Sequence, residues 1–312
     1  METARRHFPA APFPWLDLST GIAPWAYPFG DVAAYAWQRL PEPEALRALE
    51  GEAAGYFGVD KPEQVVAVPG SDMALRLLAG LVPAKRIGIV GHSYGGYAKA
   101  WPQAEVMPFE RALKADLLIC ANPNNPDGSW IEERLLQRPR NQRVIDEAFA
   151  DAEPRLSLLP RRNGAVVLRS FGKFFGLAGI RLGFVVADRP LAQSLRNELG
   201  DWPVSGPAIE VARRAYADRD WHEQQRRRLH TASERLLALL RRHGLHDAGG
   251  TTQFRLVETA NAAGLFDHLC AHGVLVRPFT ERPAALRVGL PGTERDWSRL
   301  TAALSQWNPC HD

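Results

Sequence analysis

Short apolar runs alternate with stretches of helical periodicity along the first two thirds of the chain. Short runs in which nearly every position is apolar are typical of strands that are buried on both faces. Such strands are predicted at residues 65–68, 86–90, 117–121, 143–146, 165–169 and 182–187. Helices are predicted between or around them, among them 43–56 and 72–81. The alternation indicates an α/β domain with a mostly parallel central sheet covered by helices.

The pattern changes after Pro190. Residues 207–242 are rich in arginine and predict one or two amphipathic helices. A strand, a helix, two strands and a helix are predicted after them, at 252–257, 264–271, 274–277, 286–288 and 294–305. We therefore expect three parts, namely an N-terminal arm over 1–40, a large α/β domain over 41–205 and a smaller C-terminal α+β domain over 206–312.

Composition narrows the class of protein. The chain has 312 residues, 46% hydrophobic and 23% charged, which is typical of globular proteins, and its net charge of +3 does not indicate a nucleic-acid partner. Cys120, Cys270 and Cys310 form no CxxC pair, so neither a disulfide framework nor a metal site is expected. The start does not resemble a signal peptide, and no apolar stretch approaches the roughly 20 residues of a membrane span. We expect a soluble cytoplasmic protein with no membrane partner.

One motif favours a serine hydrolase. Gly91-His92-Ser93-Tyr94-Gly95 follows a predicted strand and matches the G-x-S-x-G turn that exposes a nucleophilic serine. Asp146 and either His268 or His272 would complete a triad in the required chain order. Few strands precede Ser93, however, and no HGGG-type oxyanion segment occurs. The hydrolase is kept as the alternative from another class of enzyme.

The most informative segment surrounds a single lysine. Only five of the 38 basic residues are lysines, and Lys173 lies in Ser-Phe-Gly-Lys-Phe-Phe-Gly after a predicted strand. Desolvation of an amine among aromatic side chains favours its neutral form, which attacks carbonyl groups. Ser170 precedes the lysine by three residues and Arg181 follows it by eight, so a hydroxyl and a guanidinium suited to a phosphate accompany the amine. The segment predicts a site for an aldehyde that carries a phosphate.

Other predicted strands end in polar residues that suit the same ligand. Gly70-Ser71-Asp72 opens a helix, whose first amide groups attract an anion. Asp146 ends a buried strand, where its carboxylate requires a cationic partner such as a protonated pyridine nitrogen. Asn125 lies in a turn and can donate to a ring oxygen, and Tyr94 offers an aromatic face for a planar ring.

Taken together, these segments resemble the fold type I pyridoxal-phosphate enzymes of the class I/II aminotransferase group, over essentially the whole chain. The resemblance implies a pyridoxal 5'-phosphate cofactor bound covalently by Lys173, with Asp146 paired to the pyridine nitrogen. It further implies that Asn125 contacts the ring hydroxyl and that Tyr94 stacks on the ring. The phosphate would be held by Gly70, Ser71, Asp72, Ser170 and Arg181. A homodimer is expected by the same analogy.

Within that group the chain looks like the threonine-phosphate decarboxylases of cobalamin biosynthesis, which are relatives of the histidinol-phosphate aminotransferases. The likeness rests on residues 17–25, 37–41 and 146–149. It implies conversion of L-threonine O-3-phosphate to (R)-1-aminopropan-2-yl phosphate and CO₂. Related aminotransferases usually carry Tyr where this chain has Phe149 and Leu40, and often Asn where it has Ala23. These departures argue mildly against an aminotransferase.

Two arginines resemble the family's ligands for substrate anions. Arg277 and Arg287 lie in predicted strands with apolar neighbours, which suits a substrate carrying a carboxylate and a phosphate. Which arginine binds which group stays open. Two further alternatives remain, an aminotransferase of the histidinol-phosphate type and the non-enzymatic effector domain of a transcription regulator. The regulators carry an added N-terminal DNA-binding domain, for which residues 1–40 are too short and too rich in proline.

Overall fold

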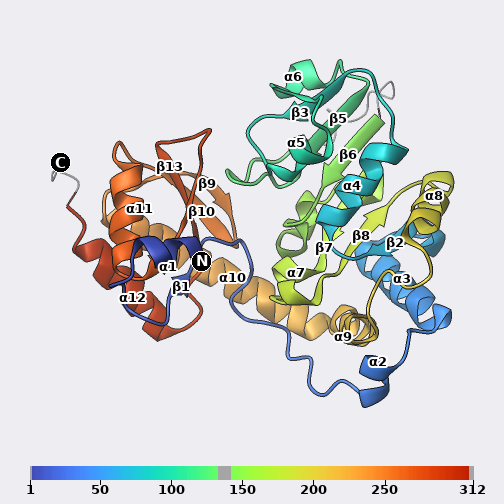
Figure 1. The fold of residues 1–312 in the computed structure, drawn as a ribbon, viewed down its shortest axis with the longest axis horizontal. Coiled ribbons are helices and arrows are strands. Elements are labelled where there is room, and N and C mark those ends of the chain that lie inside the picture. The colour runs from blue at the N-terminus through green and yellow to red at the C-terminus, as the bar shows by residue number, and fades with distance from the viewer. Residues whose placement is uncertain (1, 133–141, 309–312) are drawn as a thin grey trace. The chain divides into compact units, whose positions relative to one another are not determined.

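The computed structural model describes residues 2–132 and 142–308, and these fall into two compact units (Figure 1). One unit comprises Ala26–Asn125 and Ser129–Gln224, and we call it the sheet unit. The other comprises Met1–Trp25, Pro126–Gly128 and Gln225–Asp312, and we call it the terminal unit. The division between Gln224 and Gln225 falls inside one helix, α10 (Arg219–Arg242). The expected domain limits at 40 and 205 stay a prediction.

The sheet unit is built on a seven-stranded sheet in the order β2-β8-β7-β6-β5-β3-β4. All neighbouring strands are parallel except at β8, which is antiparallel to both β2 and β7. The strands are β2 (Val65–Val68), β3 (Ile87–Val90), β4 (Glu105–Met107), β5 (Leu117–Ala121), β6 (Gln142–Asp146), β7 (Val166–Ser170) and β8 (Gly183–Val186). The predicted α/β fold with a mostly parallel sheet is confirmed.

Apart from the start of α10, the described α-helices of the sheet unit lie before β2, in the connections from β2 to β5, between β7 and β8, and after β8. They are α2 (Ala34–Gln38), α3 (Pro43–Phe57), α4 (Ser71–Leu81), α5 (Gly96–Ala100), α6 (Phe109–Ala112), α7 (Phe171–Phe174), α8 (Arg189–Leu199) and α9 (Gly206–Ala217). Because β2, β5 and β7 are buried along their whole length, each strand needs apolar side chains on both faces. This requirement explains the continuous apolar runs of β2, of β5 and of residues 166–168 in β7.

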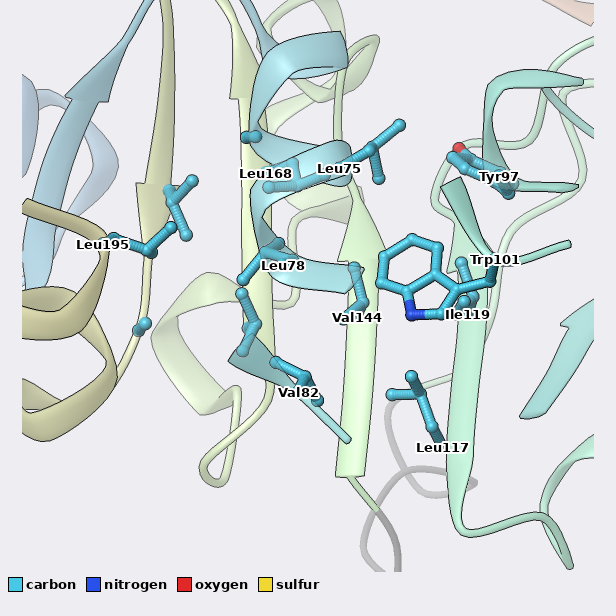
Figure 2. Packing of buried hydrophobic residues seen from close by; sticks show 14 of the residues in the cluster. Leu75, Leu78, Val82, Tyr97, Trp101, Leu117, Ile119, Val144, Leu168 and Leu195 are labelled. Carbon is cyan, nitrogen blue, oxygen red and sulfur yellow. The ribbon is translucent and has the colours of Figure 1, made fainter. Parts of the chain in front are cut away.

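One apolar cluster joins α4 and α5 to the sheet (Figure 2). Leu75 and Leu78 of α4 belong to this cluster together with Leu168 of β7, and Trp101 lies beside Ile119 of β5 with Tyr97 nearby. All these side chains are buried. Removal of such side chains from water is the main term that stabilises a core of this kind. The cluster therefore fixes the start of α4 and the turn before α5 relative to the strand ends.

Another group of side chains, mostly aromatic, packs where α3 and α9 meet. Phe171 and Phe175 stack at 4.4 Å between ring centres, and Tyr216 meets the edge of both. Phe175 also stacks on Trp221 at 5.5 Å. Since Phe171 and Phe175 flank Lys173 in the chain, this packing anchors the lysine segment at both ends.

The terminal unit has an antiparallel sheet in the order β12-β13-β10-β9, and a parallel pair of β1 with β11. Its strands are β1 (Leu16–Asp17), β9 (His246–Thr251), β10 (Phe254–Glu258), β11 (Val274–Leu275), β12 (Arg277–Pro278) and β13 (Ala285–Gly289). Its helices are α1 (Glu2–His7), α11 (Ala262–Ala271), α12 (Glu294–Ser305) and the part of α10 after Gln224. The mixture of helices with an antiparallel sheet agrees with the α+β pattern predicted after Pro190.

Among the described elements that were not predicted, three have a clear physical reason. The edge strand β4 exposes Glu105 and Val106, so it lacks an apolar run. Strand β9 has the sequence His-Asp-Ala-Gly-Gly-Thr. Glycine and aspartate are rare in strands, so the sequence lacks the apolar alternation that predicts one. Helix α8 has three charged residues among eleven and buries only Ala192 and Leu195. Cys310 lies outside the described residues, and among those described no helix combines the length and apolarity needed to cross a bilayer.

Candidate active site

The predicted site residues of the sheet unit lie after the carboxyl ends of strands, on one side of the sheet. Val68 at the end of β2 is paired in register with Gly183, and Gly183 is paired with Ser170 at the end of β7. Asp146 ends β6, where its backbone is paired with Leu168. In open α/β sheets, the carboxyl ends of the parallel strands are the usual place for a ligand.

A small cradle forms between β2 and α4. Gly70 has φ +88°, a conformation that favours glycine, and a Cβ there would lie 2.6 Å from an Nη atom of Arg181. A Cβ on Gly183 would lie 2.6 Å from the amide nitrogen of Ser71. Among the described residues no side chain caps the start of α4, so its first amide groups are available to an anion. The space, the guanidinium and the amides together fit a phosphate.

Tyr94 and Asp72 hold each other at the start of α4. The Tyr94 hydroxyl donates to Asp72 Oδ1 at 3.0 Å, and Arg76 Nε donates to Asp72 Oδ2 at 3.3 Å. The ring of Tyr94 is 41% exposed and meets the ring of Tyr97 edge-on at 5.6 Å. Tyr94 therefore has a fixed ring with an open surface, as a stacking residue needs.

Asp146 is a buried carboxylate with defined donors. Oδ2 accepts the hydroxyl hydrogen of Tyr97 at 2.9 Å, and Oδ1 accepts the amide hydrogen of Ala148 at 2.9 Å. Burial raises the pKa of Asp146, while these two donors and the nearby Lys173 act in the opposite direction. The site can hold an ionised carboxylate, and a cationic ring nitrogen would stabilise it further.

Lys173 lies on α7, a single turn whose phenylalanines are buried. Its Nζ is 5.8 Å from the centre of the Phe149 ring, and Phe149 follows Asp146 by three residues. Lys173 is half-buried, whereas the other four lysines of the chain are exposed. The amine thus lies near Asp146 in partly desolvated surroundings, which suits attack on a carbonyl.

The turn after β5 is held against Asp146 by its first residue. The Asn122 amide donates to the Asp146 carbonyl at 2.8 Å, and the Asn122 side chain bonds to Leu156 O and to Ile131 N. Asn125, the residue expected to donate to a ring oxygen, is half-buried in this turn. Asn122 was not singled out from the sequence, although a fully buried amide in such a turn has to be hydrogen-bonded.

A buried triad of charges lies directly next to these residues in the chain. Arg169, which precedes Ser170, pairs with Glu147 at 3.0 Å and also with Asp151. All three side chains are buried, and the guanidinium lies over the Phe57 ring at 4.7 Å. The sequence did carry a signal for this triad, because a charged residue inside the apolar run 165–169 needs a buried partner.

Arg277 and Arg287 belong to the terminal unit, where they face each other in register across β12 and β13. Arg287 is buried and donates to the Ser19 carbonyl at 2.6 Å, while Arg277 is exposed. Burial and the charge of Arg277 lower the pKa of Arg287 to about 10. Two guanidinium groups in register repel each other, so this pair favours an anion beside it.

Three positions were named above at which the chain differs from related aminotransferases. Of these residues, Ala23 and Phe149 are buried and Leu40 is exposed.

The alternative serine hydrolase finds little support in the described residues. Ser93 Oγ is buried and has no hydrogen-bond partner there, and Asp146 bonds to Tyr97. His268 Nε2 contacts the Ala303 carbonyl and His272 Nδ1 the His268 carbonyl, each at 2.8 Å. These contacts engage the triad candidates elsewhere. Nor do the described residues include a group of three or more His, Cys, Asp or Glu suited to a metal.

Replacing Ser93 by alanine is therefore expected to leave kcat and KM within about twofold of their values in the unmodified protein. A small substitution outside the catalytic groups has little effect of its own. The check is a steady-state assay of kcat and KM together with labelling by a serine-directed phosphonate. A loss of several orders of magnitude, with loss of labelling, would establish the hydrolase instead.

Comparison with known proteins agrees with this geometry. Residues 32–304 match the family described as aminotransferase class I and II. A threonine-phosphate decarboxylase of Pseudomonas aeruginosa is 44% identical over all of this chain and 97% of its own length. One from a Sinorhizobium species is 38% identical over 97% of this chain and 95% of its own. The crystal structure of histidinol-phosphate aminotransferase from Sinorhizobium meliloti in complex with pyridoxal-5'-phosphate has a TM-score of 0.81, at 21% identity, over 97% of this chain and 93% of its own.

Proposed function

Because the chain belongs to the aminotransferase class I and II family, we propose that it is a pyridoxal-phosphate-dependent lyase that decarboxylates L-threonine O-3-phosphate. The products are (R)-1-aminopropan-2-yl phosphate and CO₂, as used in cobalamin biosynthesis. The observation that carries the proposal is the 44% identity to a threonine-phosphate decarboxylase over the full length of this chain. The cradle, the buried carboxylate and the half-buried amine in the sheet unit supply the groups that this chemistry needs.

Each functional part of the cofactor would have its own residues in the sheet unit. The phosphate would be held by the α4 amides from Gly70 onward, with Ser71, Asp72, Ser170 and Arg181. The aldehyde would be bound by the Lys173 amine, and the cationic ring nitrogen by Asp146. The ring would lie against Tyr94, with Asn125 near the ring oxygen. When bound, pyridoxal phosphate supplies an electron sink for a bond broken at the substrate's Cα.

The chain's own residues select which bond breaks. With pyridoxal phosphate bound, the bond that breaks would depend on how the protein orients the substrate, so a decarboxylase would have to present the carboxylate rather than the Cα hydrogen for cleavage. We assign the anions of the substrate to Arg277 and Arg287, whose paired positive charge suits a carboxylate or a phosphate. The Lys173 amine, which would bind the cofactor's aldehyde, is also the residue we assign to return a proton to Cα.

We further propose that the protein acts as a homodimer in the cytoplasm. Phe29, Tyr35, Trp37 and Leu40 are each at least 44% exposed, and so many large apolar side chains along one short segment favour a covering subunit. The described cysteines, Cys120 and Cys270, are both free and buried, in keeping with a reducing compartment.

A product assay separates decarboxylation from transamination. The purified protein with pyridoxal phosphate is given carboxyl-labelled L-threonine O-3-phosphate, and CO₂ release is measured with and without 2-oxoglutarate. We expect one CO₂ per substrate consumed, with no requirement for 2-oxoglutarate. A parallel reaction supplies histidinol phosphate and 2-oxoglutarate. Formation of glutamate in that reaction, without release of CO₂ from L-threonine O-3-phosphate, would instead establish an aminotransferase.

A further inference from the structure

Tyr97 is a buried tyrosine whose hydroxyl donates a hydrogen bond to Asp146. Its side chain is 1% exposed and packs in the cluster of α4, α5 and the sheet (Figure 2). At the polar end of the ring, the hydroxyl lies 2.9 Å from Asp146 Oδ2. Burial and the neighbouring Asp146 raise the pKa of Tyr97 well above its usual value, so the hydroxyl stays protonated and is the donor in this bond.

The two donors to Asp146 bond to different oxygens of its carboxylate. The Ala148 amide takes Oδ1 and Tyr97 takes Oδ2, which fixes the rotation of the carboxylate group. An ionised carboxylate has about four lone-pair positions, so each oxygen keeps one for a further donor. The Ala148 amide comes from the turn directly after Asp146, but Tyr97 precedes Asp146 by 49 residues and belongs to the buried apolar cluster. Tyr97 is thus the donor that ties Asp146 to the body of the fold.

We propose that Tyr97 is a positioning residue, which holds the Asp146 carboxylate ionised and correctly turned for the cationic ring nitrogen of pyridoxal phosphate. The inference rests on the proposed function, because it takes Asp146 as the partner of that nitrogen. Without the hydroxyl, Asp146 loses a donor to its charged form while its burial stays the same. The ionised carboxylate would then be less favoured, and its attraction for the ring nitrogen weaker.

A cycle of two enzymes and two cofactors isolates this role. The dissociation constants of pyridoxal phosphate and of its 1-deaza analogue, in which a carbon replaces the ring nitrogen, are measured by absorbance titration of the apoprotein and of Tyr97→Phe. The substitution removes one oxygen and keeps the ring that packs in the core. We expect it to weaken pyridoxal phosphate binding roughly tenfold, as for loss of a hydrogen bond to a charged group, and to leave binding of the 1-deaza analogue unchanged.

Tyr27→Phe is the matched control. Tyr27 is also buried, and its hydroxyl also lies near a carboxylate, 3.5 Å from Asp218 Oδ2. This variant is expected to bind both cofactors like the unmodified protein. A second cycle uses Asp146→Asn, in whose background Tyr97→Phe should no longer affect the binding of pyridoxal phosphate, whatever its effect on thermal stability.

The outcomes separate this inference from the proposed function. Equal weakening of both cofactors by Tyr97→Phe, or no weakening of either, overturns the positioning role and leaves the function as proposed. A persistent effect of Tyr97→Phe in the Asp146→Asn background overturns it as well. Failure of the unmodified protein to bind pyridoxal phosphate at Lys173 overturns the proposed function itself.

Discussion

Replacing Lys173 by alanine is expected to lower the rate of decarboxylation by about four orders of magnitude or more, because one amine provides both the covalent attachment of the cofactor and a proton donor. The residue lies half-buried on α7 between buried phenylalanines, 5.8 Å from the centre of the Phe149 ring. No other lysine of the chain has comparable surroundings, since the remaining four are exposed. The measurement is release of labelled CO₂ under saturating substrate, in single-turnover and steady-state assays.

Lys99→Ala is the control for this loss, because it removes an exposed lysine from α5 of the same unit. It should retain full activity. Borohydride reduction followed by peptide mass mapping provides a readout that does not depend on turnover. A pyridoxyl-phosphate adduct is expected on the peptide that contains Lys173 in the unmodified protein and in Lys99→Ala, and on no lysine in Lys173→Ala. Full activity of Lys173→Ala would remove the basis for the cofactor assignment.

Replacing Arg169 by methionine is expected to destabilise the sheet unit by about 3–5 kcal/mol, because it leaves the Glu147 and Asp151 carboxylates buried without their guanidinium. Methionine keeps most of the side-chain volume beside Phe57, so the loss reports charge rather than a cavity. The free energy of unfolding is measured by urea denaturation of the apoprotein. The control is Arg86→Met, since the Arg86–Asp116 ion pair is exposed and should matter far less.

The destabilisation should depend on pH with a definite sign. Burial already raises the pKa of Glu147 in the presence of Arg169, which opposes that rise. Without Arg169 the folded-state pKa of Glu147 must rise further above its unfolded value, so the folded variant binds a proton more readily. Stability of Arg169→Met is then greatest below the unfolded pKa and is lost as pH rises through the folded one. A loss that is equal at pH 5 and pH 8 would contradict this account.

Elements with strong local patterns could be predicted from the sequence. Strands β2 and β5 lie at the predicted residues because their apolar runs are buried along the whole length. Helix α12 also has its predicted limits, since Thr293 and Asp296 form a capping box at its start. Strands β4 and β9 escaped prediction because tertiary pairing, rather than local sequence, makes them strands.

The candidate site shows the same division. Lys173, Asp146 and the start of α4 follow strands and carry distinctive residue types, so their positions could be inferred from chain order. The role of Tyr97 could not be inferred in this way. It depends on the contact of the Tyr97 hydroxyl with Asp146, which lies 49 residues later in the chain. The contact between Gly183 and the Ser71 amide likewise depends on the pairing of β2 with β8, which no local pattern reveals.

Asp146 and Glu147 are adjacent carboxylates with different partners, Tyr97 for the first and Arg169 for the second. Successive residues of an extended chain point to opposite sides of the sheet, so inserting or deleting one residue within β6 would turn both carboxylates to the other side. A deletion would bring the longer side chain of Glu147 to the place beside Tyr97, whereas an insertion would leave the shorter side chain of Asp146 at the place that faces Arg169. Related chains of different length must therefore gain or lose residues elsewhere, and β6 should be a stretch in which only substitutions accumulate during evolution.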